Sequence, residues 1–330
     1  MTQPALRDRY HRIINYLRIS VTDRCNLRCA YCMPEEGVPS LDPTEILSYE
    51  ELLRVARVAV RLGIWKIRVT GGEPLVRKGI LGFLWELARL SGVRDLCLTT
   101  NGILLAEAAA QLRRAGLRRV NVSLDTLRPE RFERIARRNG LDRVLAGIRA
   151  ARQHGLQPVK VNVVAMRGVN DDELPDFVEF ARVEGVEVRF IEFMPGGGAW
   201  DESRVIPAAE VLERLSARFR LEPLREPGST GPSRTYRLPD GTRIGVISPL
   251  SDHFCGTCNR LRLTAAGRLR TCLFSNREID LRRVLRSGVD DGVLEAVLRD
   301  AVARKPPGHG MECSVPAREA DRPAMNRVGG

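Results

Sequence analysis

Aromatic residues are scarce in this sequence: Phe, Trp and Tyr together make up 5% of its 330 residues. Proteins that bind single-stranded nucleic acid stack bases on aromatic side chains, so this composition argues against such a role. No run of 18 or more apolar residues occurs, and residues 1–12 are polar and basic. We therefore expect neither a transmembrane helix nor a secretory signal, but a cytoplasmic protein.

Acidic residues are too few to balance the basic ones, since 41 Asp and Glu face 53 Lys and Arg and the formal net charge is +12. An excess of this size is typical of a protein that binds an anion, although arginine spread over solvated helices gives the same number. No G-x4-G-K-[ST] sequence is present. A phosphate group would therefore be held by side chains rather than by a P-loop.

Short apolar segments alternate with amphipathic ones through the first two thirds of the chain. This spacing predicts right-handed βαβ units and a parallel sheet. The predicted strands cover residues 16–21, 66–70, 95–99, 119–124, 159–165 and 186–192. The predicted helices cover residues 49–62, 80–90, 104–115, 129–138, 143–154, 173–184 and 207–219.

Almost every predicted strand ends in polar or glycine-rich sequence, such as Gly71-Gly72-Glu73-Pro74 or Thr100-Asn101-Gly102. A parallel barrel collects its active site from the C-terminal ends of many strands, whereas a doubly wound sheet uses one switch point. The six units are too few for the eight of a complete barrel. The sequence therefore favours an α/β fold with an incomplete (β/α)6 TIM-like barrel.

The pattern changes in the last third of the chain, and we predict a domain at 1–222 followed by a C-terminal α+β module at 223–330 that closes the barrel. Residues 223–233 contain Pro, Gly and Ser and predict a loop. Two hairpins are expected, one at 234–247 and one at 260–272. The helical patterns lie at 277–286 and 291–304.

Cys25, Cys29 and Cys32 form a C-x3-C-x2-C motif directly after the first predicted strand. Three thiolates at this spacing can hold three irons of a [4Fe–4S] cluster and leave the fourth iron open. An open iron can bind the amino and carboxylate groups of S-adenosylmethionine (SAM), whose reductive cleavage gives a carbon radical. A zinc site needs four ligands, and only His11 lies nearby upstream. We interpret this motif as a cluster site for radical chemistry.

Cys255, Cys258 and Cys272 form a second set with the pattern C-x2-C-x13-C. If the second hairpin pairs as predicted, Cys258 and Cys272 lie close together at its open end. Zinc is a stronger alternative here, because C-x2-C pairs are common in zinc sites and His253 would supply a fourth ligand. The spacing alone leaves zinc and an iron–sulfur cluster both open.

Strand alternation places Arg260, Arg262, Arg268 and Arg270 on one face of the second hairpin, with Arg262 opposite Arg270, and Leu261 on the other face. Arginines on neighbouring strands repel one another, so such a face favours a bound anion. Arginine also binds phosphate in a bidentate manner. The hypothesis is a triphosphate site, and the alternative is a solvated arginine face.

These cysteine motifs resemble those of the radical SAM superfamily, and along the whole chain the sequence resembles the GTP 3′,8-cyclase family. The segments that carry the resemblance are residues 17–20 (LRIS), 29–34 (CAYCMP), 66–74 (KIRVTGGEP), 98–102 (LTTNG), 121–125 (NVSLD), 160–162 (KVN) and 189–195 (RFIEFMP), the second cysteine set and the Gly-Gly end. The second cysteine set and the Gly-Gly end make the resemblance specific within the superfamily.

The resemblance implies two [4Fe–4S] clusters, with GTP between them. It implies that SAM is cleaved to a 5′-deoxyadenosyl radical, which takes hydrogen from C3′ of the ribose before the ribose radical attacks C8 of guanine. The product would be 3′,8-cyclo-7,8-dihydro-GTP, the first intermediate of molybdenum cofactor biosynthesis, which passes to the cyclic pyranopterin monophosphate synthase. A flavodoxin- or ferredoxin-type electron donor and a monomer or homodimer are implied as well.

The resemblance also implies roles for individual residues. Contacts to SAM are implied for Tyr31, Gly72, Ser123 and Met194. Contacts to GTP are implied for Arg18, Arg68, Thr99, Lys160, Arg260, Leu261 and Arg262, with Lys66 and Arg189 as further triphosphate partners. Gly329 and Gly330 are implied to reach the active site and to be needed for catalysis.

The residues themselves allow plainer interpretations of some of these positions. Gly71-Gly72 can be a tight turn, Met194 a core residue, and a C-terminal Gly-Gly a flexible end. Two other functions remain open: a radical SAM enzyme that modifies a peptide or protein, and a zinc-containing nucleic-acid-binding protein. The metal content distinguishes the second of these from the others.

Overall fold

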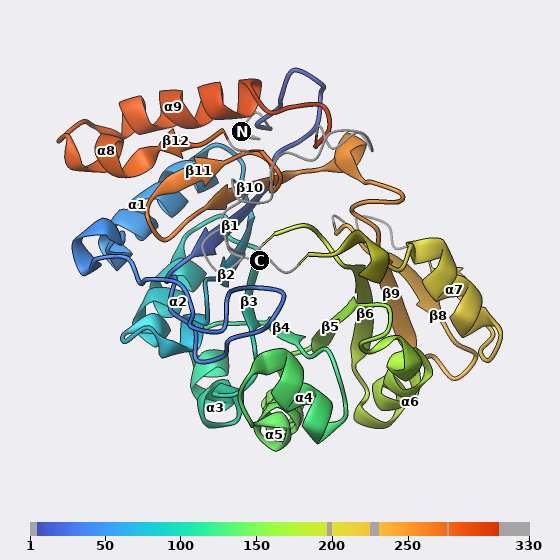
Figure 1. Ribbon diagram of the computed structural model, residues 1–330. Helices are drawn as coiled ribbons and strands as arrows, with labels where there is room; N and C mark the ends of the chain where they lie inside the picture. Colours follow the sequence, from blue (N-terminus) through green and yellow to red (C-terminus); the bar gives the residue numbers. More distant parts are fainter. Residues whose placement is uncertain (1–4, 197–199, 225–230, 276, 310–330) are drawn as a thin grey trace.

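The computed structural model describes residues 5–196, 200–224, 231–275 and 277–309. Their strands form one twelve-stranded mixed sheet with the order β12-β11-β10-β1-β2-β3-β4-β5-β6-β9-β8-β7. Figure 1 shows the strands along an arc, with helices such as α1, α3 and α6 on its outer side. None of the helices in the described part of the chain is long and apolar enough to cross a membrane.

The centre of the sheet consists of six parallel strands in chain order, as predicted. They are β1 (Tyr16–Ser20), β2 (Lys66–Thr70), β3 (Asp95–Thr100), β4 (Arg119–Ser123), β5 (Lys160–Ala165) and β6 (Glu187–Glu192). The intervening helices are α1 (Tyr49–Arg61), α2 (Ile80–Arg89), α3 (Leu105–Arg114), α4 (Pro129–Ala136), α5 (Leu141–Gln153) and α6 (Leu174–Glu184). Strand β2 is buried along its whole length, which is typical of parallel strands covered on both faces.

The last third of the chain adds one parallel strand to each end of this core. Strand β9 (Arg243–Ile247) pairs in parallel with β6, and β10 (Arg260–Leu263) pairs in parallel with β1. Residues 248–259 therefore lead from one end of the parallel core to the other. The described strands β9 and β10 do not pair with each other, so the barrel stays open.

Antiparallel strands complete both edges of the sheet. Strands β8 (Arg234–Arg237) and β7 (Glu222–Leu224) follow β9. Strands β11 (Arg268–Arg270) and β12 (Ile279–Asp280) follow β10. The predicted domain boundary at 222/223 falls inside β7, and the division into two domains stays a prediction.

Both predicted hairpins are present, and Arg262 lies opposite Arg270 as expected. Gly267 in the second turn has a φ of +75°, and a Cβ there would lie 2.8 Å from the Cβ of Arg282. Both facts require glycine.

Helices α7 (Ala208–Ser216), α8 (Leu281–Arg286) and α9 (Asp291–Ala303) surround this region. The single helix predicted at 277–286 is wrong in its first part. Ile279 and Asp280 pair with β11 instead, and the Asp280 carboxylate caps α8 by accepting from the Arg283 amide at 2.9 Å.

Candidate active site

A cavity lies on the inner side of the arc, where side chains from eight parallel strands meet. It is lined by Tyr16 and Arg18 of β1, Arg68 of β2, Thr99 of β3, Asn121 of β4, Asn162 of β5, Arg189 and Ile191 of β6, Ile247 of β9, and Arg260 and Arg262 of β10. Residues two apart on a strand share a face, which is why β1, β6 and β10 each contribute a pair. Cys255, Cys258 and Cys272 line the same cavity.

A row of arginines forms one wall of this cavity. Arg18 lies in register between Arg262 on β10 and Arg68 on β2. Burial, with Arg18 and Arg260 as neighbours, lowers the pKa of Arg262 well below its usual value. Burial lowers the pKa of Arg18 to about 10, and Arg68 and Arg260 act in the same direction. Guanidinium groups crowded in this way are stabilised by an anion among them.

Several polar atoms of the cavity have no hydrogen-bond partner among the described residues. They are the Asn121 and Asn162 side-chain oxygens and the Nε of Arg260, all buried. Arg68, in contrast, is fixed by the Tyr16 hydroxyl at 2.6 Å and the Thr99 hydroxyl at 3.0 Å. Because buried polar groups are normally paired, the open donors and acceptors fit a bound polar ligand.

Lys160 and Arg189 are joined by Glu187, which sequence reasoning missed. The Lys160 ammonium donates to one Glu187 oxygen at 2.8 Å, and Arg189 donates to the other at 2.6 Å. Burial lowers the pKa of Lys160 to about 8, and Arg189 contributes. The only signal in the sequence is that Glu187 and Arg189, two apart on one strand, share a face.

Not every predicted GTP contact reaches the cavity wall. Arg18, Arg68, Thr99, Arg189, Arg260 and Arg262 do. Lys160 and Lys66 are not among the lining residues, and the Lys66 ammonium lies 3.5 Å from Asp95. Leu261 is 1% exposed and belongs to the hydrophobic core on the other face of β10, so its side chain does not face the cavity.

The predicted arginine face of the second hairpin is divided in the structure. Arg268 pairs with Asp280 at 2.6 Å and Arg270 with Glu278 at 3.0 Å. Arg260 and Arg262 face the cavity instead. The carboxylates neutralise the outer strand, so the basic surface that faces the cavity comes from the inner strand β10.

The first cysteine site lies on the loop after β1, where Cys25, Cys29 and Cys32 are all half-buried. Burial, followed by neighbours that include Cys32 and Cys25, raises the pKa of Cys29 well above its usual value, so the three thiols lie near one another. The Leu27 amide at 3.4 Å and the Asn101 side-chain amide at 3.7 Å both donate to the Cys25 sulfur. Three converging thiols fit a [4Fe–4S] cluster with one open iron.

The loop after β2 packs closely against the first cysteine loop. A Cβ on Gly72 would lie 2.2 Å from the Arg24 carbonyl oxygen, so this position requires glycine. Glu73 accepts from the Thr100 hydroxyl at 2.8 Å and the Asn101 amide at 2.7 Å, and burial raises its pKa to about 7. The Gly-Gly-Glu sequence thus holds the end of β3 against the cysteine loop.

Of the other predicted SAM contacts, Tyr31 and Met194 line two different cavities, and Ser123 lines neither of them. Tyr31 lines a second cavity together with Met166 and Phe193, and Met194 lines the main cavity. The Tyr31 hydroxyl donates to Asp125 at 2.7 Å, and burial raises the pKa of Asp125 to about 6. Ser123 is half-buried at the end of β4.

The second cysteine site brings Cys255, Cys258 and Cys272 together, as the hairpin predicted. Cys255 opens a short turn before β10, and Cys272 follows the end of β11. Burial raises the pKa of Cys255, and the neighbouring Cys272 and Cys258 add to the effect. Burial acts in the same direction on Cys258, but Arg260 and Lys305 outweigh it and lower the pKa of Cys258 to about 7.

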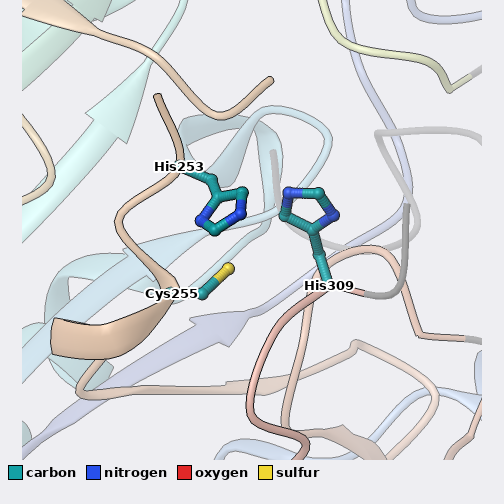
Figure 2. A group of neighbouring side chains, drawn as sticks. All are labelled: His253, Cys255 and His309. Carbon is teal, nitrogen blue, oxygen red and sulfur yellow. The ribbon is translucent and has the colours of Figure 1, made fainter. Parts of the chain in front are cut away.

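Two histidines adjoin this second site. Figure 2 shows His253, Cys255 and His309 pointing toward one another, and one potential ligand atom of each lies within 4.8 Å of the other two. The two imidazole rings pack edge to face with centroids 4.9 Å apart. Sequence reasoning named His253 as a zinc candidate but missed His309, which lies in an irregular segment without a motif. This geometry keeps zinc as the alternative metal for the site.

Gly329 and Gly330 lie outside the described residues, so their placement stays a prediction.

Two family models match the chain: the Radical SAM superfamily over residues 19–181 and Molybdenum Cofactor Synthesis C over residues 186–311. The chain is 50% identical over 328 residues to the GTP 3′,8-cyclase of Geobacter sulfurreducens, with 98% of this chain and 99% of the relative covered. It is 50% identical over 309 residues to the GTP 3′,8-cyclase of Moorella thermoacetica, with 93% and 96% covered.

Among solved structures, the chain is similar in fold to Streptococcus suis SuiB bound to S-adenosylmethionine. The TM-score is 0.61 at 14% identity, over 87% of this chain and 68% of SuiB. The curated relatives are far closer in sequence and match along nearly their whole length. The chain therefore belongs to the GTP 3′,8-cyclase family of the radical SAM superfamily.

Proposed function

We propose that this protein converts GTP to (8S)-3′,8-cyclo-7,8-dihydroguanosine 5′-triphosphate, the first step of molybdenum cofactor biosynthesis. The observation that carries the proposal is the basic cavity that the second three-cysteine site lines, in a chain 50% identical to curated GTP 3′,8-cyclases. An arginine wall of this kind fits a triphosphate, because Arg donates to phosphate in pairs and keeps its charge when buried.

Cys25, Cys29 and Cys32 would hold the cluster that binds SAM, with Tyr31, Gly72, Ser123 and Met194 as contacts to that cofactor. When bound, the cluster and SAM supply a hydrogen-abstracting radical. Gly72 lets the cysteine loop and the β2 loop approach each other without a side chain between them.

The triphosphate would lie against Arg18, Arg68, Arg260 and Arg262, with Arg189, Lys160 and Lys66 near its far end. Glu187 orients Lys160 and Arg189 by accepting from both. Asn121 and Asn162 offer acceptors to ligand hydroxyl groups. These residues would bind and orient the nucleotide.

Cys255, Cys258 and Cys272 would hold a second [4Fe–4S] cluster. Its support is the convergence of the three thiols on the cavity wall. The alternative is zinc, favoured by the positions of His253 and His309 around Cys255. Iron and zinc analysis of the anaerobically purified protein separates the two: about eight irons per chain fits two clusters, and about four irons with one zinc fits the alternative.

The activity is tested by anaerobic reconstitution with iron and sulfide, reduction with dithionite, incubation with SAM and GTP, and mass analysis. A cyclised isomer of GTP together with 5′-deoxyadenosine is the expected result. Formation of 5′-deoxyadenosine without conversion of GTP would show that the enzyme acts on another substrate, such as the peptide of the alternative hypothesis.

The Gly329-Gly330 end and the partners are also part of this proposal. A bulky C-terminal tag should abolish GTP conversion and leave both clusters in place, while full activity of the fusion contradicts a role for the end. A flavodoxin- or ferredoxin-type donor would supply the electron, and the cyclic pyranopterin monophosphate synthase would take the product. The protein would act in the cytoplasm, as a monomer or homodimer.

A further inference from the structure

Lys305 is among the largest fully buried side chains of the protein, with 2% of its surface exposed. It follows helix α9 and belongs to none of the motifs found in the sequence. A buried lysine is costly unless its ammonium group is fully paired. The groups that pair with it therefore indicate what it does.

Within the described part of the chain, the Lys305 ammonium donates to backbone carbonyls that flank the second cysteine site. It donates to the Arg260 carbonyl at 3.1 Å and to the Thr271 carbonyl. Its positive charge also lies near the Cys258 sulfur and lowers the pKa of that thiol. Arg260 begins β10 two residues after Cys258, and Thr271 directly precedes Cys272.

These contacts join the two ends of the hairpin that carry cysteines. Strands β10 and β11 pair only at Arg262–Arg270 and Leu263–Leu269, so their ladder does not extend to Cys258 and Cys272. Beyond the ladder, the ammonium bridges the two backbone segments. It thereby fixes the separation of two of the three thiols.

A cation beside a thiolate also changes the electronic state of a cluster. A hydrogen bond to a ligating sulfur and a nearby positive charge both stabilise the reduced, more negative cluster and raise its reduction potential. Three other cations lie near this site: Arg262, Arg260, which lies over the Phe254 ring at 4.6 Å, and Arg12. Arg12 donates to the carbonyls of Cys255 and Pro307.

We propose that Lys305 is a positioning residue of the second cluster: it holds Cys258 and Cys272 at cluster-binding distance and raises the cluster's reduction potential. This inference rests on the proposed second cluster. The site needs such a group because the metal is bound by segments before and after a short hairpin. The first cysteine loop, within eight residues of continuous chain, needs none.

The test uses two variants of this residue. Lys305→Met keeps the length of the side chain and removes its charge and its hydrogen-bond donors, whereas Lys305→Arg keeps the charge. The exposed neighbour Arg304→Met, whose guanidinium pairs with Asp300, is the matched control. Iron content and an EPR-monitored redox titration are measured for each cluster, and the first cluster serves as the reference within the same molecule.

Lys305→Met should either lose the second cluster alone or lower its reduced-to-oxidised ratio about tenfold at a fixed potential, which is about 59 mV for one electron. Lys305→Arg should recover much of the potential, and Arg304→Met should match wild type. An unchanged second-cluster content and potential in Lys305→Met would overturn the proposal.

If Lys305→Met loses both clusters, wild-type protein grown with 15N-lysine tests whether the lysine lies beside the second cluster. Electron–nuclear double resonance should detect 15N coupling on the reduced second cluster and none on the first, and its absence on the second contradicts the contact. A wild-type protein with only about four irons per chain would instead refute the second cluster itself. Failure of the proposed function and failure of this inference are thus distinguishable.

Discussion

The two cysteine sites have the same number of thiols and opposite electrostatic surroundings. Around the first site, the buried carboxyls of Glu73 and Asp125 have pKa values raised by burial to about 7 and about 6, and the pKa of Cys29 is raised as well. Around the second site lie the cations Arg260 and Lys305, and the pKa of Cys258 is lowered to about 7.

In the proposed function, this difference would sort SAM and GTP between the two sites. SAM carries a sulfonium and an ammonium group, whose positive charges suit buried carboxyls. GTP carries a triphosphate, which suits the arginine wall between Arg18 and Arg262. We therefore propose that the charges around each set of thiols, rather than the thiols themselves, determine which ligand each site favours.

The largest effects should come from the cysteines themselves. Cys29→Ser should abolish both 5′-deoxyadenosine formation and GTP conversion, because the cluster that binds SAM is lost. Cys258→Ser should abolish GTP conversion and leave some 5′-deoxyadenosine formation, since the first site is intact. Quantifying both products by mass spectrometry checks this, and equal loss of 5′-deoxyadenosine in both variants would contradict separate roles.

Substitutions in the arginine wall should change the affinity for GTP and leave the affinity for SAM unchanged. Arg262→Met removes hydrogen bonds between charged groups, each worth about 1.5–3 kcal/mol, so the Kd for GTP should rise about tenfold to a hundredfold. Arg268→Met on the neighbouring strand, where the guanidinium pairs with Asp280, is the control and should change the Kd little. Calorimetric titrations of each variant with GTP and with SAM measure the difference. A similar loss of SAM affinity in Arg262→Met would show that the sites are not sorted by charge.

A substitution at the first site, Gly72→Ala, should affect SAM and not GTP. Gly72→Ala places a Cβ 2.2 Å from the Arg24 carbonyl, so the backbone must shift, at a cost of about 1–3 kcal/mol. SAM affinity and the melting temperature should fall together, while GTP affinity is unaffected. Gly82→Ala in helix α2 is the matched control, because its Cβ would meet no atom within 4 Å and alanine favours a helix by about 0.5–1 kcal/mol. A melting temperature as high in Gly72→Ala as in Gly82→Ala would contradict the close approach.

The smallest effect should be a pH dependence of GTP binding. The Lys160 pKa is lowered to about 8, so the ammonium is charged at pH 7 and loses its proton as the pH rises through 8. GTP affinity should therefore fall severalfold between pH 7 and pH 9. Lys160→Arg, which stays charged throughout, should flatten this profile, and an equally steep profile in that variant would assign it to another group.

Much of the parallel core was predictable. Its apolar residues follow the pattern expected of a buried strand or of an amphipathic helix, and a glycine or polar residue marks the end of each element. The first part of the helix predicted at 277–286 was wrong, because Ile279 and Asp280 pair with β11 and such tertiary pairing overrides local helical periodicity.

The cysteines, and the arginines that line the cavity, were predictable for a different reason. They occur in motifs or at strand positions whose facing follows from alternation. Glu187, Asp125, His309 and Lys305 were missed, because their roles come from residues that are distant in sequence. Lys305, for example, donates to Arg260, 45 positions away.

The pairing of β10 with β1 has a consequence for how the protein is made. Asn259 donates to the Asn15 side chain at 2.7 Å across 244 positions, and Arg12 donates to the Cys255 carbonyl across 243. Contacts this remote form late in folding, and chains emerge from the ribosome N-terminus first. The loop with Cys25, Cys29 and Cys32 is complete early in synthesis, whereas the second site awaits the last strands. In the proposed function, a nascent chain would thus complete its SAM contacts, the last of which is Met194, before Cys255, Cys258 and Cys272 are made, so delaying metal delivery until chain release would prevent radical generation without a substrate pocket.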